Sequence, residues 1–279
     1  MNNKNYRIDG LTVLYNPNKS VLKNIDSYID DIDLLYVVDN SPVQNFDIVS
    51  QIKKKSKVIY FFNNNRGGIA AALNIGAKTA IKNNANWLLT MDQDSSFKGN
   101  DFIKFCSYLS LINYDEISII SPFHCIFSDS LPSSNQPTEV KVVMTSGNLL
   151  NIDIYKKIGD FRESFFIDYV DYDYCLRSLK KGFKIIRYND ILLNHQLGNS
   201  KLYFSKILVT NHSTYRRYFI TRNRLFLIKE HFTSNFTLSM QLIKHTITDF
   251  IKILFFESEK LKKVSAVFKG YKDFILNKL

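Results

Sequence analysis

The sequence has few cysteines and no long run of uncharged hydrophobic residues. Its three cysteines, Cys106, Cys125 and Cys175, are widely spaced and form no C-x-x-C pair, so the sequence indicates neither a zinc site nor a disulfide framework. They suit buried positions in a reducing compartment. No apolar run approaches the roughly 18 residues of a membrane span, and the polar residues 1–10 lack the apolar core of a signal peptide. We therefore expect a cytoplasmic protein.

Positive charge is unevenly distributed along the chain, whose net charge is +11. Residues 1–195 contain 22 Lys and Arg against 21 Asp and Glu, whereas residues 196–279 contain 15 against 5. A basic C-terminal segment is typical of proteins that bind an anionic surface, either membrane lipid or nucleic acid. The alternative is a basic face that is merely solvated.

The first hundred residues alternate between apolar segments and helical patterns. Strands are predicted over residues 11–15, 34–38, 58–62 and 87–91, and helices over 21–29 and 69–81. This β-α-β-β-α-β order predicts an α/β fold with a mostly parallel sheet flanked by helices. Three of the four strands end in polar clusters, which would line the same edge of the sheet. Hydrophobic residues make up 45% of the 279, enough for one large domain with a helical extension.

Two carboxylates follow the strand predicted over residues 87–91. Asp92 and Asp94 are separated by Gln93, and on an extended chain residues i and i+2 point the same way. Open α/β sheets bind their ligands just beyond the carboxyl ends of the strands. Two such carboxylates can bind one divalent cation, which can in turn bind a diphosphate. An Asp that caps the following helix is the alternative.

Four segments, taken together, resemble motifs of the glycosyltransferases of family two, which have the GT-A fold. They are Thr12-Val13-Leu14-Tyr15-Asn16-Pro17, Val37-Val38-Asp39-Asn40-Ser41, Asn65-Arg66-Gly67-Gly68-Ile69-Ala70-Ala71-Ala72-Leu73-Asn74 and Leu89-Thr90-Met91-Asp92-Gln93-Asp94-Ser95. The Asp-Gln-Asp-Ser form and the Tyr-Asn-Pro start are most similar to the rhamnosyltransferase branch. The resemblance implies a Rossmann-like fold with a nucleotide-sugar half at about residues 1–96 and an acceptor half at about 97–200.

The resemblance also implies donor-binding residues near the strand ends. Asp39 is expected to accept the N3–H of the donor's pyrimidine base, and Arg66 with the following glycines offers a cation and backbone donors near phosphate. Asp94 matches the family's metal-binding carboxylate, with Mn²⁺ or Mg²⁺ as the cation. The expected donor-side residues are Tyr15, Asn16, Asp39, Asn40, Arg66, Asp92 and Gln93. A helix-capping Asp39 and a surface Arg66 are the alternatives.

A second acidic segment precedes another predicted helix. If that helix begins near Asp171, Asp173 and Arg177 are four residues apart and can pair on one face. The segment resembles the family's Glu-Asp segment, whose second carboxylate is the catalytic base. Asp171 matches that carboxylate, but Val170 replaces the usual Glu, so Asp168 stays a second candidate. The alternative is an acidic first turn that stabilises the helix dipole.

Three further residues complete the expected site. A strand predicted over residues 140–144 ends near Gly147 and Asn148, where the glycine permits close approach of a ligand. These two residues, with Asp168, are assigned to the acceptor side. His195 lies in a His-x-x-Gly-x-Ser segment that resembles a family element whose His can complete the metal shell, and imidazole suits Mn²⁺ better than Mg²⁺. A plain tight turn and a structural His are the alternatives.

The C-terminal segment combines basic and apolar residues at helical spacing. Arg216, Arg217, Arg222 and Arg224 lie among aromatic residues, and apolar residues recur between positions 240 and 255. Basic amphipathic helices of this kind can lie on an anionic membrane leaflet. Alternatively, the apolar stripes pack on the catalytic domain or on a second subunit of a homodimer.

These features predict an inverting, metal-dependent glycosyltransferase with a catalytic domain at residues 1–200 and a basic helical extension at 201–279. The expected donor is a dTDP- or UDP-linked sugar, with dTDP-rhamnose as the first candidate. The expected acceptor is a saccharide or lipid-linked saccharide for a surface polysaccharide such as O-antigen or capsule, made at the inner face of the cell membrane. A nucleotidyltransferase is one alternative. A nucleic-acid-binding protein is the other, but it gives no reason for the paired carboxylates, so we expect no nucleic-acid partner.

Overall fold

The computed structural model describes residues 6–110, 114–125, 132–195, 201–203 and 207–279, and the side chains of residues 195 and 201–208 lie outside that description. The chain divides into two compact units. Unit 1 comprises Met1–Glu163 and Tyr174–Gln196, and unit 2 comprises Ser164–Asp173 and Leu197–Leu279. The boundary between Asp173 and Tyr174 falls inside a helix. The functional division at residue 200 remains a prediction.

The first half of unit 1 is a parallel sheet, as predicted. Its strands are β1 (Ile8–Leu14), β2 (Leu35–Asp39), β3 (Val58–Phe62) and β4 (Trp87–Asp92), in the order β3-β2-β1-β4. The prediction that β3 follows β2 without a helix was wrong, because α2 (Phe46–Lys53) connects them. Its apolar side is only three residues, Ile48, Val49 and Ile52, and it starts at an Asn45 cap, so the periodic signal is short. Parallel neighbours need such a crossover.

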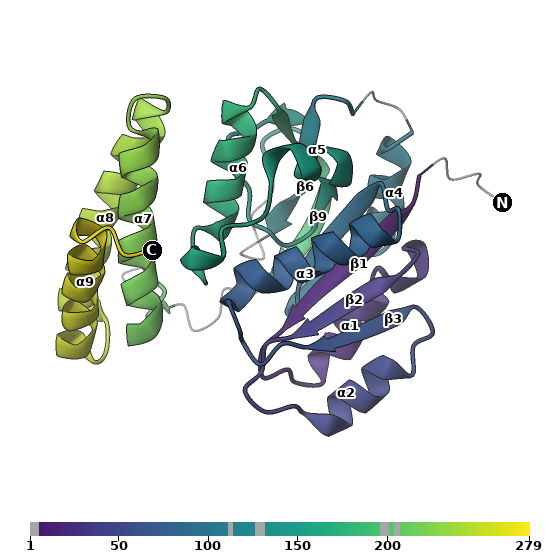
Figure 1. Ribbon diagram of the computed structural model, residues 1–279, viewed down its shortest axis with the longest axis horizontal. Coiled ribbons are helices and arrows are strands. Elements are labelled where there is room, and N and C mark those ends of the chain that lie inside the picture. The colour runs from purple at the N-terminus through teal and green to yellow at the C-terminus, as the bar shows by residue number, and fades with distance from the viewer. Residues whose placement is uncertain (1–5, 111–113, 126–131, 196–200, 204–206) are drawn as a thin grey trace. The chain divides into compact units, whose positions relative to one another are not determined.

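Helices cover both faces of these four strands (Figure 1). On one face α1 (Ser20–Asp26), η1 (Ile29–Asp31), α2 and α4 (Asp101–Tyr108) contribute to the main hydrophobic core. On the other face α3 (Gly68–Lys82) packs closely, because Gly76 has no Cβ and one would meet the Leu11 side chain at 2.5 Å. Alternate residues of each strand therefore face different helices, which explains why the strands are apolar on both sides.

The second half of unit 1 extends the sheet from β4 in the order β4-β8-β6-β9-β5 and includes antiparallel pairs. Its elements are β5 (Ser95–Phe97), α4, β6 (Ile117–Cys125), β7 (Thr138–Glu139), β8 (Asn148–Asn151), α5 (Ile152–Ile158) and β9 (Lys184–His195). Two further elements, η2 (Glu163–Phe165) and α6 (Val170–Lys180), lie partly in unit 1 and partly in unit 2. The strand predicted over residues 140–144 was wrong. Those residues are irregular beyond one hydrogen bond from Val140 N to Ile185 O, and β8 instead pairs with β4.

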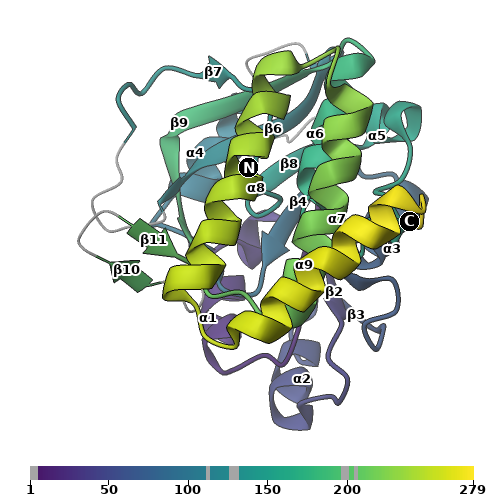
Figure 2. The same cartoon turned by 90° about the vertical axis from the view of Figure 1, so that its left-hand side faces the viewer.

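Unit 2 contains three long helices, α7 (Thr214–His231), α8 (Phe236–Phe256) and α9 (Lys260–Ile275), which lie side by side in Figure 2. It also contains the antiparallel pair β10 (Lys201–Tyr203) and β11 (Ile207–Val209). Gly270 brings α9 close to α7, since a Cβ there would meet the Tyr218 carbonyl oxygen at 2.9 Å. Within the described residues, no helix combines the length and apolarity that crossing a membrane requires.

The arginines of α7 do not form the exposed basic face that the sequence predicted. Arg217, Arg222 and Arg224 are all buried. Arg217 pairs with Glu257, which also accepts from Lys263 Nζ at 2.9 Å, and Arg224 pairs with Asp249 at 2.6 Å. A buried charge must be paired to be tolerated. These side chains are therefore part of the interior of unit 2 and cannot reach a membrane surface.

Candidate functional site

The carboxyl ends of three neighbouring parallel strands bring the predicted donor residues to one edge of unit 1. Leu14 at the end of β1 pairs in register with Asp39 of β2, and Val13 pairs with Asp92 of β4. Asp39 and Asp92 thus end the two strands that flank β1. This edge is where open α/β sheets bind ligands.

Asp39 is fully buried, and both its carboxylate oxygens accept hydrogen bonds from the protein. Ser41 N donates to Oδ1 at 2.8 Å and the Tyr60 hydroxyl donates to Oδ2 at 2.7 Å. Burial and the neighbouring carboxylate raise the pKa of Tyr60, so its hydroxyl stays protonated and remains the donor. A carboxylate has about four acceptor positions, so a base N–H could still be accepted.

The neighbouring Asn40 is also held by the protein. Its Nδ2 donates to Gly68 O at 3.0 Å, and its Oδ1 accepts from Asn63 Nδ2 at 2.8 Å. Asn40 therefore links the ends of β2 and β3 to the start of α3. This contact explains Asn40 without a ligand, and its donor role stays a prediction.

The segment after β1 is fastened to the segments after β2 and β4. Tyr15 N donates to Gln93 Oε1 at 2.9 Å, and Gln93 Nε2 donates back to Tyr15 O at 3.0 Å. Asn16 N donates to Ser41 Oγ at 2.7 Å. The side chains of Tyr15 and Asn16 remain exposed. These contacts join the backbone of Tyr15 and Asn16 to the side chains of Gln93 and Ser41 and so connect three of the four motifs. The exposed side chains of Tyr15 and Asn16 can meet a substrate.

We predicted from the sequence that Asp92 and Asp94 lie on an extended chain, and this prediction was wrong. Gln93 and Asp94 form a turn between β4 and β5, and Asp92 and Asp94 are both partly exposed. Two half-exposed carboxylates are a suitable donor set for a divalent cation that takes its other ligands from water and phosphate. Their exposure, rather than an i, i+2 geometry, is what makes them fit.

His195 ends β9, and its backbone pairs with Ser95, the residue that follows Asp94. Its side chain lies outside the described part of the structure, so its role as a metal ligand stays a prediction. Among the described side chains, no three His, Cys, Asp or Glu residues gather as a metal-binding group.

The loop after β3 presents an exposed arginine at the start of α3. Arg66 is exposed, and its carbonyl oxygen accepts from Asn63 Nδ2 at 2.8 Å. Asn64, Asn65, Gly67 and Gly68 all have positive φ. Successive residues of this kind, followed by a helix N-terminus, direct backbone N–H groups toward an anion.

The turn at residues 145–148 lies against the end of β4. Ser146 Oγ accepts from Asp92 N at 3.0 Å, and Gly147 N donates to Thr90 O at 2.7 Å. Gly147 has φ +79°, and a Cβ there would meet the Leu193 and Pro122 side chains at 2.7 and 2.8 Å. Packing therefore requires this glycine, whatever its role toward a ligand.

Asn148 is buried, and its Nδ2 donates to Met144 O at 2.7 Å. Its Oδ1 is buried with no hydrogen-bond partner among the described residues. An orphaned buried acceptor is uncommon in folded proteins and calls for an explanation. A hydroxyl donor from a bound substrate would satisfy it.

The two candidate bases belong to unit 2 and differ in their surroundings. Asp171 is partly exposed in the first turn of α6, and its Oδ1 accepts from Tyr172 N at 2.9 Å. Asp168 instead has φ +62° and forms a two-pronged ion pair with the Arg216 guanidinium, with Nε to Oδ2 at 3.0 Å. A carboxylate held in this way has a structural role. Which of the two carboxylates accepts a proton stays a prediction, with Asp171 as the first candidate.

Comparison with known proteins connects this geometry to an activity. Residues 11–138 match the model of glycosyl transferase family 2. A dTDP-rhamnosyl transferase, RfbF of Shigella flexneri, is 27% identical over 252 residues, covering 81% of each chain. The chain is therefore similar to the family 2 glycosyltransferases, and the curated relative that it resembles is a rhamnosyl transferase.

Solved structures confirm the predicted GT-A fold of this chain. S. aureus TarS residues 1–349 superpose with a TM-score of 0.60 at 12% identity, covering 96% of this chain and 81% of that one. GalNAc-T7, determined with UDP, GalNAc and Mn²⁺, gives a TM-score of 0.57 at 12% identity. That match covers 68% of this chain and 44% of the other, so this chain spans less than half the length of GalNAc-T7.

The prediction from sequence did not include some residues of the candidate site. Tyr60 and Ser41, which hold Asp39, were not proposed, although Tyr60 carries the one polar group of an otherwise apolar strand. Arg216 was assigned to a membrane surface, and Asn223 was not considered. Both are remote in sequence from the acidic segment that they contact, and only the folded chain shows the contact.

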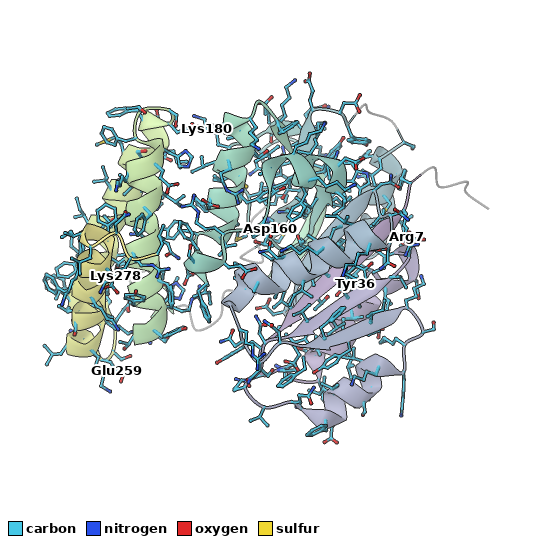
Figure 3. All side chains as sticks on the ribbon, viewed as in Figure 1. Arg7, Tyr36, Asp160, Lys180, Glu259 and Lys278 are labelled. Atoms are coloured by element: carbon cyan, nitrogen blue, oxygen red, sulfur yellow. The ribbon has the colours of Figure 1, made fainter. Side chains whose placement is uncertain are left out.

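We predict that Asp39→Asn lowers the affinity for dTDP and UDP, measured by calorimetry, by about 10- to 100-fold, the usual value of a charged hydrogen bond. Asp9→Asn is the matched control. Asp9 is another fully buried carboxylate of the same sheet, but it lies at the amino end of β1. It accepts from Tyr36 and Arg7, both of which Figure 3 labels. If both variants weaken nucleotide binding equally, Asp39 acts only through folding.

Proposed function

We propose that this glycosyltransferase is inverting and metal-dependent, and that it transfers a sugar, with rhamnose from dTDP-rhamnose as the first candidate, to a saccharide acceptor. The observation that carries the proposal is the convergence of Asp39, Asp92 and Asp94 at the carboxyl edge of three parallel strands. The donor choice is supported by the similarity to the S. flexneri dTDP-rhamnosyl transferase.

On the donor side, each group has a chemical task. Asp39 accepts from the pyrimidine base, and Arg66 with the N–H groups that follow it neutralises phosphate. Asp94 and Asp92, with His195, would hold the divalent cation, which supplies positive charge to the departing diphosphate. Asn148 Oδ1 offers an acceptor for a substrate hydroxyl.

On the acceptor side, Asp171 acts as the general base. It takes the proton of the acceptor hydroxyl while that oxygen attacks the anomeric carbon from the face opposite the diphosphate. The bond from the anomeric carbon to the phosphate oxygen breaks, its electron pair stays on the diphosphate, and the configuration inverts. One base suffices for this reaction, whereas a glycosidase needs two carboxylates that flank the bond.

A donor screen is the first test, with dTDP-rhamnose and UDP-sugars in the presence of Mn²⁺ and water taking the place of the acceptor. Release of dTDP or UDP supports glycosyl transfer. Formation of a nucleotide sugar from a sugar phosphate and a nucleoside triphosphate would instead indicate a nucleotidyltransferase.

Asp94→Ala should abolish the Mn²⁺-dependent part of dTDP affinity in calorimetry, because the carboxylate is the main protein ligand proposed for the cation. Titrations in a chelator provide the control, since wild type and variant should then bind dTDP alike. Retention of the Mn²⁺ dependence in the variant would contradict the assignment.

Asp171→Asn should reduce turnover of the best donor by 10² to 10⁴-fold, about 3–5 kcal/mol in the barrier, while dTDP affinity stays near normal. The control is Asp153→Asn, because Asp153 is also an acidic first-turn residue, in α5. If Asp171 only stabilises its helix dipole, the two variants should behave alike and lose at most about 1 kcal/mol of stability.

The proposed acceptor is lipid-linked, and unit 2 offers a surface for lipid. Side chains of α8 spaced three, four or seven residues apart are exposed and apolar, namely Phe236, Met240, Ile247, Ile251 and Leu254, and α9 exposes Leu261, Phe268 and Ile275 at seven-residue steps. Exposed lysines lie on the same two helices, at Lys244, Lys260, Lys262, Lys269 and Lys272. Apolar stripes beside lysines are typical of helices that lie on anionic membranes.

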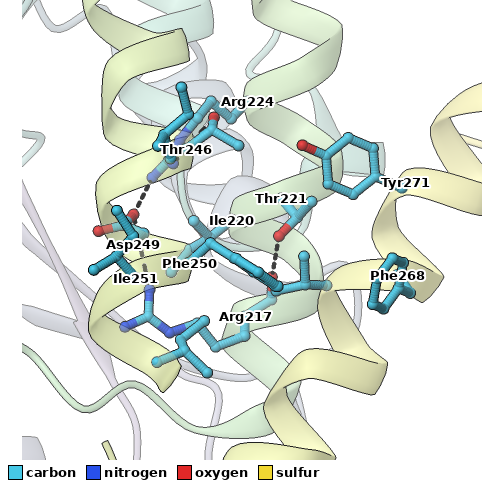
Figure 4. A pocket seen from close by; sticks show the side chains of 13 residues that line it. Arg217, Ile220, Thr221, Arg224, Thr246, Asp249, Phe250, Ile251, Phe268 and Tyr271 are labelled. Atoms are coloured by element: carbon cyan, nitrogen blue, oxygen red, sulfur yellow. Dashed lines mark hydrogen bonds and ion pairs between the residues drawn. The ribbon is translucent and has the colours of Figure 1, made fainter. Parts of the chain in front are cut away.

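A cavity of about 370 Å³ lies among α7, α8 and α9 (Figure 4). Apolar side chains form most of its walls, including the partly exposed Ile247, Ile251 and Phe268. Arg224 and Asp249 pair with each other at one side. Because its walls include the exposed apolar side chains of α8 and α9, the cavity adds to the support for a lipid surface on this part of unit 2.

Reversing two of these charges, Lys269→Glu with Lys272→Glu, should weaken sedimentation with anionic phosphatidylglycerol vesicles by at least about 30-fold, given roughly 1 kcal/mol per basic residue. The same reversal at the exposed Lys54 and Lys141 of unit 1 is the control. Equal binding to neutral and anionic vesicles would refute the electrostatic part. A stable dimer in sedimentation velocity, with no vesicle binding, would assign the surface to a second copy.

A further inference from the structure

The loop that leads into α6 has an unusual backbone. Three of its residues, Phe166, Asp168 and Tyr169, have φ of +62°, +62° and +65°, and none is glycine. Bulky residues avoid this left-handed region, so the surrounding structure must enforce the conformation. Asp171 follows only two residues after Tyr169. A strained loop next to a candidate base must therefore be held by contacts with other residues.

Within unit 2, residues of α7 hold the loop, because they donate hydrogen bonds to almost every residue of it. Asn223, with 0% of its surface exposed, directs its Nδ2 to the carbonyl oxygens of Phe165, Ile167 and Asp168 at 2.8, 3.0 and 2.9 Å. Arg222 donates to Ser164 O. One amide that donates to three carbonyl groups within four residues of the loop fixes the orientation of those groups, which the left-handed residues require.

The loop's side chains are held by the same helix. Arg216 forms the two-pronged pair with Asp168, and Arg224 Nε donates to the Tyr169 hydroxyl at 2.6 Å. The rings of Phe166 and Phe219 stack with centroids 5.2 Å apart. Each of the three left-handed residues thus has its own side-chain contact with a residue of α7.

The helix that makes these contacts is itself fixed from behind. Arg224 Nη2 donates to Asp249 of α8 at 2.6 Å. Gly270 of α9 approaches the backbone of Tyr218 and Arg222 so closely that a Cβ would be 2.9 and 3.2 Å from them. Asn223 Oδ1 accepts from Arg222 Nε at 3.0 Å, which sets the rotamer of the amide. The three helices of unit 2 therefore act as a rigid support for the loop.

We propose that Arg216 and Asn223 are positioning residues for the transfer reaction: they hold the strained loop 164–169 and thereby set the direction of Asp171. The proposal rests on the proposed role of Asp171 as base. Without the contacts the left-handed residues relax to ordinary φ values, the first turn of α6 moves with them, and the carboxylate leaves its place. A misplacement of about 1 Å is enough to reduce a rate by about 100-fold.

Arg216→Lys is the sharpest variant, because lysine keeps the charge but cannot form the two parallel bonds. Asn223→Ala removes all three donations but leaves a buried void, so it serves only as a harsher companion. The matched control is Arg7→Lys, since Arg7 also pairs with an aspartate and is 38% exposed, against 40% for Arg216. Arg216→Lys should lower kcat for Mn²⁺-dependent dTDP-rhamnose hydrolysis by about 10- to 100-fold. KM and the melting temperature should stay near those of Arg7→Lys.

Combining Arg216→Lys with Asp171→Asn separates the positioning role of Arg216 from the proposed role of Asp171 as base. If Arg216 acts through Asp171, the lysine variant should have no further effect once the carboxylate is gone, because residues that act as one unit are not additive. The same fold loss in both backgrounds, or a KM effect without a kcat effect, would overturn the positioning role. Normal turnover in Asp171→Asn alone would instead refute the proposed base, whatever Arg216 does.

Discussion

The parallel pairing of β1 between β2 and β4 is the constraint on which the rest of the site depends. Parallel strands end at the same edge, so the residues that follow β1, β2 and β4 must meet there, although they are separated by 24 to 53 positions, from Tyr15 to Asp39 and from Asp39 to Asp92. The contacts between Tyr15 and Gln93 and between Asn16 and Ser41 then tie the loops together. The donor edge is rigid because its backbone is already satisfied, which leaves Asp92, Asp94 and Arg66 partly or fully exposed for a ligand.

The second constraint is the handling of charge in unit 2. Burying Arg217, Arg222 and Arg224 would be strongly unfavourable if they were unpaired, and each has an internal acceptor: Glu257, loop and Asn223 oxygens, or Asp249. Such pairs add little net stability compared with apolar packing, but removing one partner is costly. Their value is directional. They place N–H donors at defined points along α7, and those donors hold a loop that would not otherwise keep three left-handed residues.

In the proposed function, the two constraints serve different tasks. The proposed nucleotide site uses groups that converge from several strands, which a parallel sheet provides. The proposed base follows a loop held in an improbable conformation, which a buried polar network provides. Asp168 illustrates the difference, because it lies only three residues before Asp171 and is also an aspartate, yet it pairs with Arg216. The exposed lysines and apolar side chains of α8 and α9 lie outside this network. They are the groups that would contact the proposed lipid surface.

The sequence by itself determined the parallel α/β class, the four strands with their polar ends, and the start of α6 near Asp171, because these depend on local apolar periodicity and on motifs within one segment. It failed at α2, whose apolar side is only three residues long, and at residues 140–144, which are irregular, while Asn148–Asn151 forms the strand that pairs with β4. It also could not reveal that Asp39 is held by Tyr60, that Gly147 is required by Leu193 and Pro122, or that Arg217, Arg222 and Arg224 of α7 are buried. Those facts depend on contacts between residues far apart in the chain, and a local pattern of charge is the same whether its partner is an aspartate, a lipid or water. Only tertiary structure decides which of these the charge meets.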